Sequence, residues 1–303
     1  MTQSLMGLLL YNKPAFLTSF QALNLVKKSF LTKKAGHTGT LDKFASGLLL
    51  VLIGRAVKLS PLFLNHSKVY IGEISFGTET DTLDPEGSII AKGDIPSLSD
   101  IEKAVLKFQG NIMQLPPSYS ALHIDGQRAY KIAREGREVM MKERPVCIHE
   151  LKILSYDAPI LKIRAHVSSG TYIRSLARDI AVEAGSRAHL SSLTRIGIDA
   201  FSLEDAIDAD SLKAAMQSEV LKYLNPLNTA LFNTINVPVL YVKDKKSFFH
   251  GKALEKLFGK EELSVYGQAS PYVAVFSSED NDFLGYITKE NDKWSYGHVF
   301  TPA

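Results

Sequence analysis

A short segment at residues 35–47, AGHTGTLDKFASG, places one carboxylate among glycines and hydrogen-bond donors. Asp42 is the only acidic residue in the first 60, where eight lysines and arginines create a positive local field. Gly36 and Gly39 let a ligand approach the backbone closely, and the side chains that can donate to it are His37, Thr38 and Thr40. An aspartate in such a loop is often a turn or cap residue. The surrounding lysines instead favour a phosphate-bearing ligand and a chemical role for the carboxylate.

Other kinds of site find little support in the sequence. The loop lacks the Gly-Lys-Ser/Thr ending of a P-loop, and no Gly-x-Gly-x-x-Gly follows a predicted strand, so we expect neither ATP nor NAD. The eight histidines are dispersed and Cys147 is the single cysteine, so we expect neither a metal site nor an internal disulfide. No Gly-x-Ser-x-Gly elbow occurs, although this alone does not exclude a Ser-His-Asp triad. We therefore expect a site without metal or cofactor.

The elements that position this loop follow from hydrophobic periodicity. Strands are predicted at 7–14, 48–54, 68–77, 147–156 and 160–170, the last two paired, because apolar residues there are continuous or alternate. Helices are predicted from Thr18 or Ser19 to residue 31, at 55–64 with a break or start near Pro61, and at 171–185 with Gly185 as C-cap. Another helix is expected to begin with a capping box formed by Ser99 and Glu102.

A change of pattern near residue 235 predicts a domain boundary. Before it, strands and helices mix as in an α+β protein; after it, short strands such as PVLYV, LSVYG, YVAVF and FLGYI alternate with polar turns, which is typical of a small β barrel. We therefore expect two domains, 1–235 and 236–303. The first residues lack the features of a signal peptide, and the apolar run at 47–54 is too short to cross a membrane. A cytoplasmic protein without membrane contact is expected.

Taken together, the motifs resemble those of the TruB family of tRNA pseudouridine synthases, which isomerise uridine 55 in the T arm. AGHTGTLD is followed by ASGLLLVLIGRAVK, and the other matching motifs, in the family's order, are YNKP at 11–14, KVY at 68–70, GTETDTLDPEG at 77–87, QLPPSYSALHIDGQRAYKIAREG at 114–136, SSGTYIRSLARDI at 168–180 and HLSSLTRIGI at 189–198. The resemblance covers residues 7 to about 200 and, more loosely, the C-terminal region. It implies an α+β catalytic domain, with a central mixed or antiparallel sheet flanked by helices, and a C-terminal PUA-type β-barrel-like domain.

By this resemblance, Asp42 is the essential catalytic aspartate. Breaking a glycosidic bond develops charge at the sugar C1′, which a carboxylate can stabilise or capture covalently. The resemblance also implies that Arg174 pairs with Asp42, and that Tyr70 stacks on the target base and is a candidate for removing the C2′ proton; glycal and Michael-adduct routes both stay open. His37 would fill the space left by an everted base. The other residues implied in substrate binding or loop ordering are Lys13, Thr38, Gly39, Thr40, Asp84, Tyr172, Leu193 and Arg195.

The resemblance extends to partners. Residues 119–144 are similar to the family's loop that closes over RNA, and the C-terminal domain would contact the tRNA acceptor arm. We expect a monomer that acts on tRNA without an obligate protein partner. Lys43 stands where the family usually has proline, and is expected either to contact a phosphate or to leave the loop more mobile. The alternatives are a base-removing glycosylase, an RNA-binding or tRNA-folding module in which Asp42 is idle, and a subunit of a guide-RNA-dependent synthase.

Overall fold

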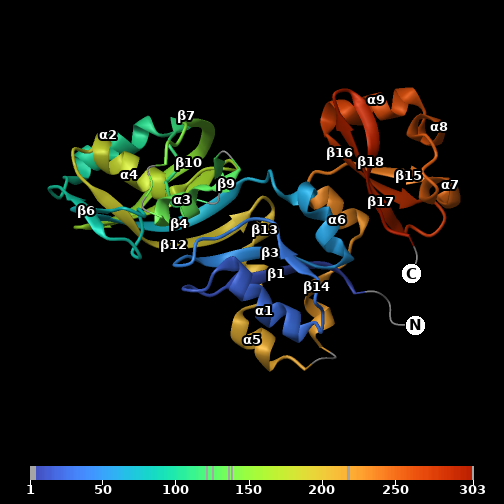
Figure 1. Cartoon of the computed structure of the whole chain (residues 1–303), viewed down its shortest axis with the longest axis horizontal. Coiled ribbons are helices and arrows are strands. Elements are labelled where there is room, and N and C mark those ends of the chain that lie inside the picture. The colour runs from blue at the N-terminus through green and yellow to red at the C-terminus, as the bar shows by residue number, and fades with distance from the viewer. Residues whose placement is uncertain are drawn as a thin grey trace.

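The computed structural model describes residues 5–120, 122–124, 126–135, 137, 139–216 and 219–301. Within these residues a ten-stranded sheet forms the body of the molecule, and a four-stranded sheet forms its C-terminal part (Figure 1). The large sheet has the order β14-β1-β3-β12-β4-β11-β10-β7, with β13 paired to β12 and β2 paired to β3. All of these pairs are antiparallel except β3 with β12. This confirms the predicted α+β class with a mixed central sheet.

The strands fall into four groups. Those of the large sheet are β1 (Met6–Lys13), β2 (Ala35–His37), β3 (Ser46–Gly54), β4 (Lys68–Phe76), β7 (Gly110–Gln114), β10 (Arg144–Asp157), β11 (Ile160–Val167), β12 (Ala188–Ile198), β13 (Phe201–Ser202) and β14 (Leu224–Asn225). Two hairpins lie outside it, β5 (Thr78–Thr80) with β6 (Ile89–Lys92) and β8 (His123–Ile124) with β9 (Gln127–Arg128). The C-terminal sheet contains β15 (Val239–Val242), β16 (Tyr272–Ser277), β17 (Phe283–Glu290) and β18 (Lys293–Val299).

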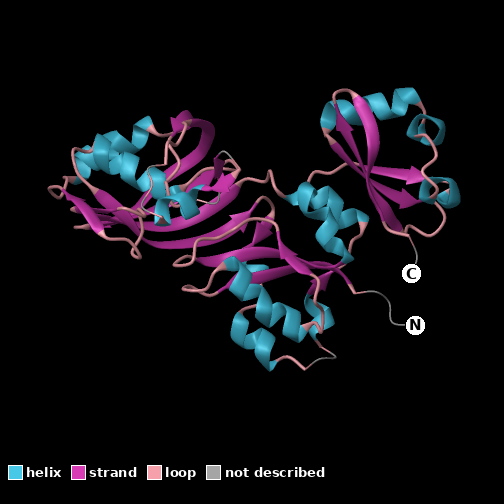
Figure 2. Ribbon diagram, in the orientation of Figure 1, coloured by secondary structure: helices cyan, strands magenta, loops and turns pink. Residues whose placement is uncertain are grey.

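The helices flank the two sheets, and some lie between the body and the C-terminal sheet (Figure 2). Those of the body are α1 (Ser19–Ser29), the 3-10 helix η1 (Arg55–Phe63), α2 (Leu98–Lys107), α3 (Ala129–Arg134), α4 (Ile173–Glu183), η2 (Leu203–Asp205), α5 (Ala209–Ala214), η3 (Val220–Tyr223) and α6 (Thr229–Thr234). The C-terminal part adds α7 (Lys245–Phe249), α8 (Leu254–Phe258) and α9 (Lys260–Ala269). No helix of the described residues is both long and apolar enough to cross a membrane.

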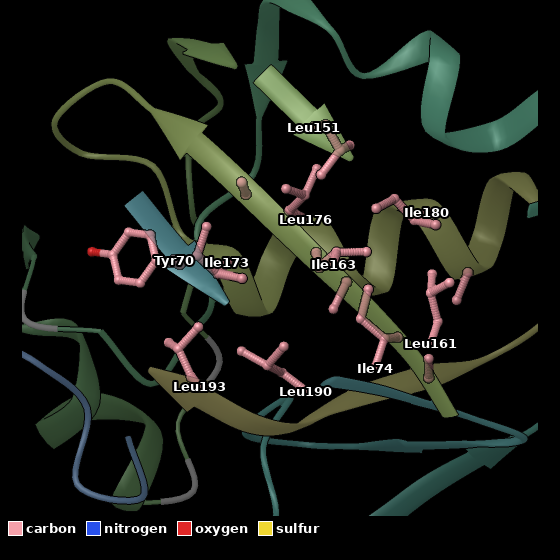
Figure 3. Close-up of a cluster of buried hydrophobic side chains, with 14 of the residues drawn as sticks. Tyr70, Ile74, Leu151, Leu161, Ile163, Ile173, Leu176, Ile180, Leu190 and Leu193 are labelled. Atoms are coloured by element: carbon pink, nitrogen blue, oxygen red, sulfur yellow. The ribbon is translucent and has the colours of Figure 1, made fainter. Parts of the chain in front are cut away.

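The main core lies between α2, α4 and one face of the strands β4, β10, β11 and β12. Its strands bury every second residue, as predicted, because successive side chains point to opposite faces of a sheet; in β11 the buried residues are Leu161, Ile163, Ala165 and Val167. In α4 the buried apolar residues recur at helical spacing, and Gly185 follows the C-cap Ala184 with φ +72°. Figure 3 shows Tyr70 at the edge of this core, with its hydroxyl pointing away from the aliphatic side chains.

The strands β1 and β3 are buried on both faces, which explains their continuous apolar sequences. One face packs against α1 and α5. The other face belongs to a cluster that includes Leu8 and Leu50 together with Phe232 of α6 and Phe276 of β16. This cluster joins the body of the molecule to the C-terminal sheet, which also has a core of its own around Phe248 and Val275.

Three predictions about local structure are wrong. The 3-10 helix η1 runs continuously through Pro61, where a break or a helix start was predicted. The helix α2 begins at Ser97, not at a capping box of Ser99 and Glu102: the Ser97 hydroxyl accepts a hydrogen bond from the backbone N–H of Asp100. The segment LSVYG, predicted as a strand, lies inside the helix α9. The first turn of α9 carries Glu261 and Glu262, which stabilise a helix N-terminus, and Leu263 is its buried anchor.

The segment 119–144, expected to close over RNA, forms the β8–β9 hairpin and α3 in its described part. Positions 121, 125, 136 and 138 of this segment lie outside the described residues, as do positions 1–4 at the start of the chain and 302–303 of the expected C-terminal domain. At the first described residue of the segment, the backbone carbonyl of Tyr119 accepts a hydrogen bond from Arg174. The beginning of this segment is therefore part of the candidate site.

Candidate functional site

Most of the predicted site residues meet at a cavity where β3, β12 and β4 lie side by side. The loop between β2 and β3 contributes one wall, the strands β4 and β12 the floor, and the start of α4 the opposite wall. The cavity has a volume of about 350 Å³, within the range of pockets for small ligands. The predicted residues that line it are Thr38, Gly39, Thr40, Asp42, Tyr70, Tyr172, Arg174, Leu193 and Arg195.

An ion pair between Asp42 and Arg174 is the central feature of this cavity. Arg174 donates from Nε to Oδ2 of Asp42 at 2.9 Å and from Nη2 to Oδ1 at 3.0 Å. This two-point contact fixes the plane of the carboxylate, which a single-point contact from lysine could not do. The side chain of Arg174 is 4% exposed, whereas that of Asp42 is 34% exposed. The buried guanidinium therefore fixes the carboxylate on its protein side, and the carboxylate stays accessible from the cavity.

The remaining donors of Arg174 are also used. Nη1 donates to the carbonyl of Thr82 at 2.8 Å and to Oδ2 of Asp84 at 3.3 Å, and Nη2 also donates to the carbonyl of Tyr119 at 3.1 Å. Asp84 lies outside the lining of the main cavity but shares an adjacent one with Asp42 and Arg174. Burial raises the pKa of Asp84, while the Thr82 hydroxyl and Arg174 act against this rise. The guanidinium thus ties the turn at 82–84 to the Asp42 loop.

The Asp42 loop is fastened at both ends. Ser19 of α1 donates its hydroxyl to the carbonyl of Leu41 at 3.0 Å and accepts the Leu41 backbone N–H at 2.9 Å. Arg195 donates to the carbonyl of Gly39 near the start of the loop and to the carbonyl of Leu48 in the strand that follows it. Gly47 sits against the backbone of Arg195, where a Cβ would lie 2.3 Å from the Arg195 carbonyl oxygen, and its φ of +110° suits glycine. The resemblance implied Arg195 in substrate binding or loop ordering, whereas the contacts of Ser19 and Gly47 were not predicted from the sequence.

We expect Ser19→Ala to lower the free energy of unfolding by roughly 2–3 kcal/mol, because a buried N–H and a buried carbonyl of Leu41 both lose their partner. Urea denaturation measures this directly. Ser29→Ala is the matched control at the far end of the same helix, since Ser29 makes one long hydrogen bond, 3.5 Å, to the carbonyl of Leu212. Equal losses in the two variants would show that the Ser19 contact has no special role.

Two other predicted residues lie outside the described lining of the cavity. Lys13 is fully buried, and its Nζ donates to the carbonyls of Pro14 at 2.9 Å and Leu17 at 2.6 Å. Burial lowers the pKa of Lys13 to about 8, with Arg195 acting in the same direction and Asp42 against it. Lys13 therefore orders the turn that follows β1, and in this structure its ammonium group does not face solvent.

His37 is the other residue outside the lining. It ends β2, next to Thr38, whose backbone N–H is bonded to the carbonyl of Leu50. Burial, with a contribution from Arg195, lowers the pKa of His37, so the ring is neutral near pH 7. Its Nδ1 is buried and has no hydrogen-bond partner among the described residues.

Backbone contacts determine the positions of the aromatic residues Tyr70 and Tyr172 in the cavity. Tyr70 belongs to β4, where it is paired with Arg195 of β12 on one side and Ala165 of β11 on the other. Tyr172 is the N-cap of α4, and the buried amide of Gln114 clamps its backbone, accepting its N–H at 2.9 Å and donating to its carbonyl at 3.1 Å. Burial raises the pKa of the Tyr172 hydroxyl.

Lys68 also lines the cavity, although sequence analysis assigned it no role. Its Nζ donates to the carbonyl of His66 at 2.6 Å, and burial lowers the pKa of Lys68 to about 8, with Arg195 adding to the effect. Its position two residues before Tyr70 on one strand was a usable signal, because such residues share a face of the sheet.

Lys43, expected to contact a phosphate or leave the loop mobile, forms an ion pair with Glu86, so the loop has a further link to the turn after Asp84.

The chain is similar in sequence to characterised relatives. A sequence model described as TruB family pseudouridylate synthase (N terminal domain) matches residues 27–173. The protein named tRNA pseudouridine synthase B from Borreliella burgdorferi (strain ZS7) is 46% identical over 212 residues, which are 69% of this chain and 75% of the relative. The protein of the same name from Clostridium kluyveri is 33% identical over 286 residues, which are 91% of this chain and 97% of the relative.

Solved structures extend the likeness to the whole fold. The chain in the structure titled "Crystal structure of the archaeal box H/ACA sRNP Nop10-Cbf5 complex" superposes with a TM-score of 0.68 at 21% identity, covering 98% of this chain and 86% of that one. A chain from a Cbf5-Nop10-Gar1 complex gives a TM-score of 0.67 at 21% identity, covering 97% of this chain and 84% of the other. These matches establish the architecture, including its C-terminal part. The sequence matches show that the chain belongs to the TruB family of pseudouridylate synthases.

Proposed function

We propose that this chain converts a uridine of tRNA to pseudouridine, and that its target is uridine 55 in the T loop. The observation that carries the proposal is the Asp42 carboxylate, fixed at two points by buried Arg174 and open to a cavity that it shares with Tyr70. Relatives named tRNA pseudouridine synthase B support tRNA as the substrate. The motifs shared with the TruB family support uridine 55 as the position.

The reaction needs only groups that the cavity holds. The N1–C1′ bond of uridine breaks, a C5–C1′ bond forms, the C5 proton leaves and N1 takes up a proton, so the composition is unchanged and no oxidant or reductant is required. Charge that develops at C1′ can be stabilised or captured by the Asp42 carboxylate. We propose that Tyr70, which lines the cavity, stacks on the detached base, and it is our candidate for removing the C2′ proton if the reaction passes through a glycal. Leu193 supplies an apolar contact for the base.

The target base must leave its stack before it can enter the cavity, which costs a few kcal/mol. We propose that the neutral ring of His37 compensates by occupying the space that the base vacates, because an uncharged, partly exposed aromatic ring is suited to stacking on bases. Thr38, Gly39 and Thr40 follow His37 along the wall of the cavity and are our candidates for contacts with the everted nucleotide. Lys13, Asp84 and Arg195 act by ordering the loops around it.

We propose further that residues 1–235 form the catalytic domain and residues 236–303 a separate RNA-binding domain of PUA type. The division is supported by two separate sheets and by the core around Phe248. In this proposal the C-terminal domain contacts the acceptor arm, residues 119–144 close over the T arm, and the enzyme acts as a monomer in the cytoplasm without an obligate protein partner. The cluster that joins Leu8 to Phe276 would hold the two domains in a fixed relation.

The test uses an unmodified tRNA transcript that carries tritium at C5 of its uracils. Isomerisation releases one tritium per tRNA and leaves the mass otherwise unchanged, and replacing uridine 55 by cytidine abolishes the release. Release of free uracil from the RNA would identify a glycosylase instead. Binding without release would identify a folding or binding module, and release that depends on an added guide RNA would identify a guide-dependent subunit.

The affinity for RNA should fall as the pH rises through about 8. Burial lowers the pKa of Lys68 to about 8 in the free protein, and a phosphate beside Nζ would raise it again, so binding above this pH requires uptake of a proton. The protonated form binds the phosphate, so the dissociation constant is flat below about pH 8 and increases up to tenfold per pH unit above it. Fluorescence anisotropy between about pH 7 and pH 9 measures this.

Lys68→Arg is the control for this titration, because arginine keeps its charge throughout the range. We expect this variant to show a flatter pH profile at an affinity similar to that of the parent below pH 8. An unchanged slope in Lys68→Arg would rule out contact between Lys68 and the RNA.

A further inference from the structure

The turn between β1 and α1, together with the first turn of α1, carries large apolar side chains that the fold leaves in solvent. Phe16 is 68% exposed, Leu17 38% and Phe20 67%. Phe16 also has a φ of +64°, in the left-handed region that a bulky residue rarely adopts. An exposed ring on a strained backbone does not stabilise the fold, since glycine would suit this conformation better. Leu31 shares this combination, so it is the surroundings of Phe16 that point to a function.

The strained turn is held by the buried lysine beneath it. Lys13 donates to the carbonyls of Pro14 and Leu17, the residues that bracket the tip of the turn. On the other side, Thr18 and Gln21 form a capping box, in which the Thr18 hydroxyl accepts the Gln21 N–H at 3.1 Å and the Gln21 side chain accepts the Thr18 N–H at 2.9 Å. The backbone of Phe16 is thus fixed from both sides. Its ring is presented outward by a rigid turn.

This turn is continuous with the candidate active site. Ser19, three residues after Phe16, makes the reciprocal pair of hydrogen bonds with Leu41, the residue before Asp42. Residues 14–29, which form the turn and α1, contain Lys27 and Lys28 and no acidic residue, and Nζ of Lys27 lies 5.4 Å from the centre of the Phe20 ring. An exposed aromatic ring beside these lysines, next to the reactive loop, suits a polyanion with unpaired bases.

We propose that Phe16 is a stacking platform for an unpaired base of the RNA substrate, outside the catalytic cavity, with Phe20 extending its apolar surface. The proposal rests on the proposed function, because it requires RNA to lie across the Asp42 loop. A base offers an aromatic face whatever its identity, so the platform contributes affinity and fixes the path of the strand without reading the sequence. The lysines nearby neutralise the phosphates on either side of the stacked base.

The test compares Phe16 variants for RNA affinity and for stability. Phe16→Leu keeps an apolar side chain but removes the ring, and we expect it to weaken binding of the unmodified tRNA transcript by roughly tenfold. Its salt dependence should equal that of the parent, because the ring neutralises no phosphate. Phe16→Tyr keeps the ring and should bind as the parent does. Phe16→Gly should weaken binding as Phe16→Leu does while raising the melting temperature, because it relieves the backbone strain.

Leu31→Gly is the matched control. Leu31 is also bulky, 73% exposed and left-handed, with a φ of +46°, but it follows the opposite end of α1, away from the Ser19 contact. We expect Leu31→Gly to raise the melting temperature and leave RNA affinity unchanged. If Phe16 is the platform, both glycine variants should have a higher melting temperature, and only Phe16→Gly should also bind RNA more weakly.

Three results would overturn this inference while leaving the proposed function intact. One is parent-like affinity of Phe16→Leu in an enzyme that still releases tritium. Another is a parent protein that dimerises in light scattering and becomes monomeric in Phe16→Leu, since the surface would then be a contact between copies of the chain. The last is a loss of RNA affinity in Phe16→Tyr that is as large as the loss in Phe16→Leu. Absence of tritium release from the parent would instead remove the proposed function itself.

Discussion

Asp42→Asn is expected to abolish pseudouridine formation, with a loss on the order of 10⁴-fold or more in single-turnover rate. Asparagine has the size of aspartate, but it cannot attack C1′ or stabilise a positive charge there. Its amide oxygen can still accept from Arg174, so the loop should keep its position and the free energy of unfolding should fall by only about 1–2 kcal/mol. Tritium release from the C5-labelled transcript measures the rate.

The affinity of Asp42→Asn for tRNA should match that of the parent or be slightly tighter, because the substitution removes a negative charge from a positive surface. The matched control is Asp205→Asn, the same chemical change at an exposed residue of η2 that lies outside the cavity. We expect it to leave rate, affinity and stability unchanged. Release by Asp42→Asn within about tenfold of the parent rate would mean that another group attacks the sugar.

The sequence predicted this site better than it predicted the contacts that hold it. Asp42 and Arg174 are 132 positions apart, and no periodicity or composition links them; the shared motifs of the TruB family did. Tyr70 could also be placed on the buried face of its strand from the alternation of KVYIGEISF alone, because side-chain direction in a strand depends only on local geometry.

The positioning contacts were missed because they are set by tertiary packing. Ser19 looked like an ordinary residue at the start of a helix, yet Thr18 is the cap, and the Ser19 hydroxyl is left to bond the Asp42 loop. Lys13 was implied in substrate binding or loop ordering, but its full burial depends on the carbonyls of Pro14 and Leu17, which the sequence does not place. At Lys43, where the family usually has a proline that stiffens the turn, an ion pair with Glu86 restrains the loop instead.

The prediction of LSVYG as a strand failed for a different reason. Five residues are too few to separate a period of two from one of 3.6, and valine and tyrosine favour strands. The structure decides by what surrounds them: Gly259 ends α8 with a φ of +81°, and α9 begins immediately afterwards with Leu263 directed into the core. Tertiary burial thus overrode local preference.

Arg174→Lys should lower the rate of isomerisation by roughly 10²-fold to 10³-fold while leaving tRNA affinity within a few-fold of the parent. Lysine keeps the charge, but its single nitrogen cannot replace a planar group that bonds Asp42 at two points and also bonds Thr82, Asp84 and Tyr119. A displacement of the carboxylate by about 1 Å is enough for such a loss. Saturating single-turnover kinetics separates this effect from binding.

Arg174→Met tests the structural side of the same contact. It leaves Asp84, whose side chain is 9% exposed, without its cation, and we expect a loss of about 3–5 kcal/mol in the free energy of unfolding. Arg178→Lys, one turn further along α4, is the control for both substitutions, since Arg178 bonds Asp179 and the carbonyl of Leu115 outside the cavity. It should change stability by less than about 1 kcal/mol and leave the rate unchanged. If Arg174→Lys kept the parent rate, Asp42 would be positioned by its loop alone, and the guanidinium would be only a structural tie between the Asp42 loop and the turn at 82–84.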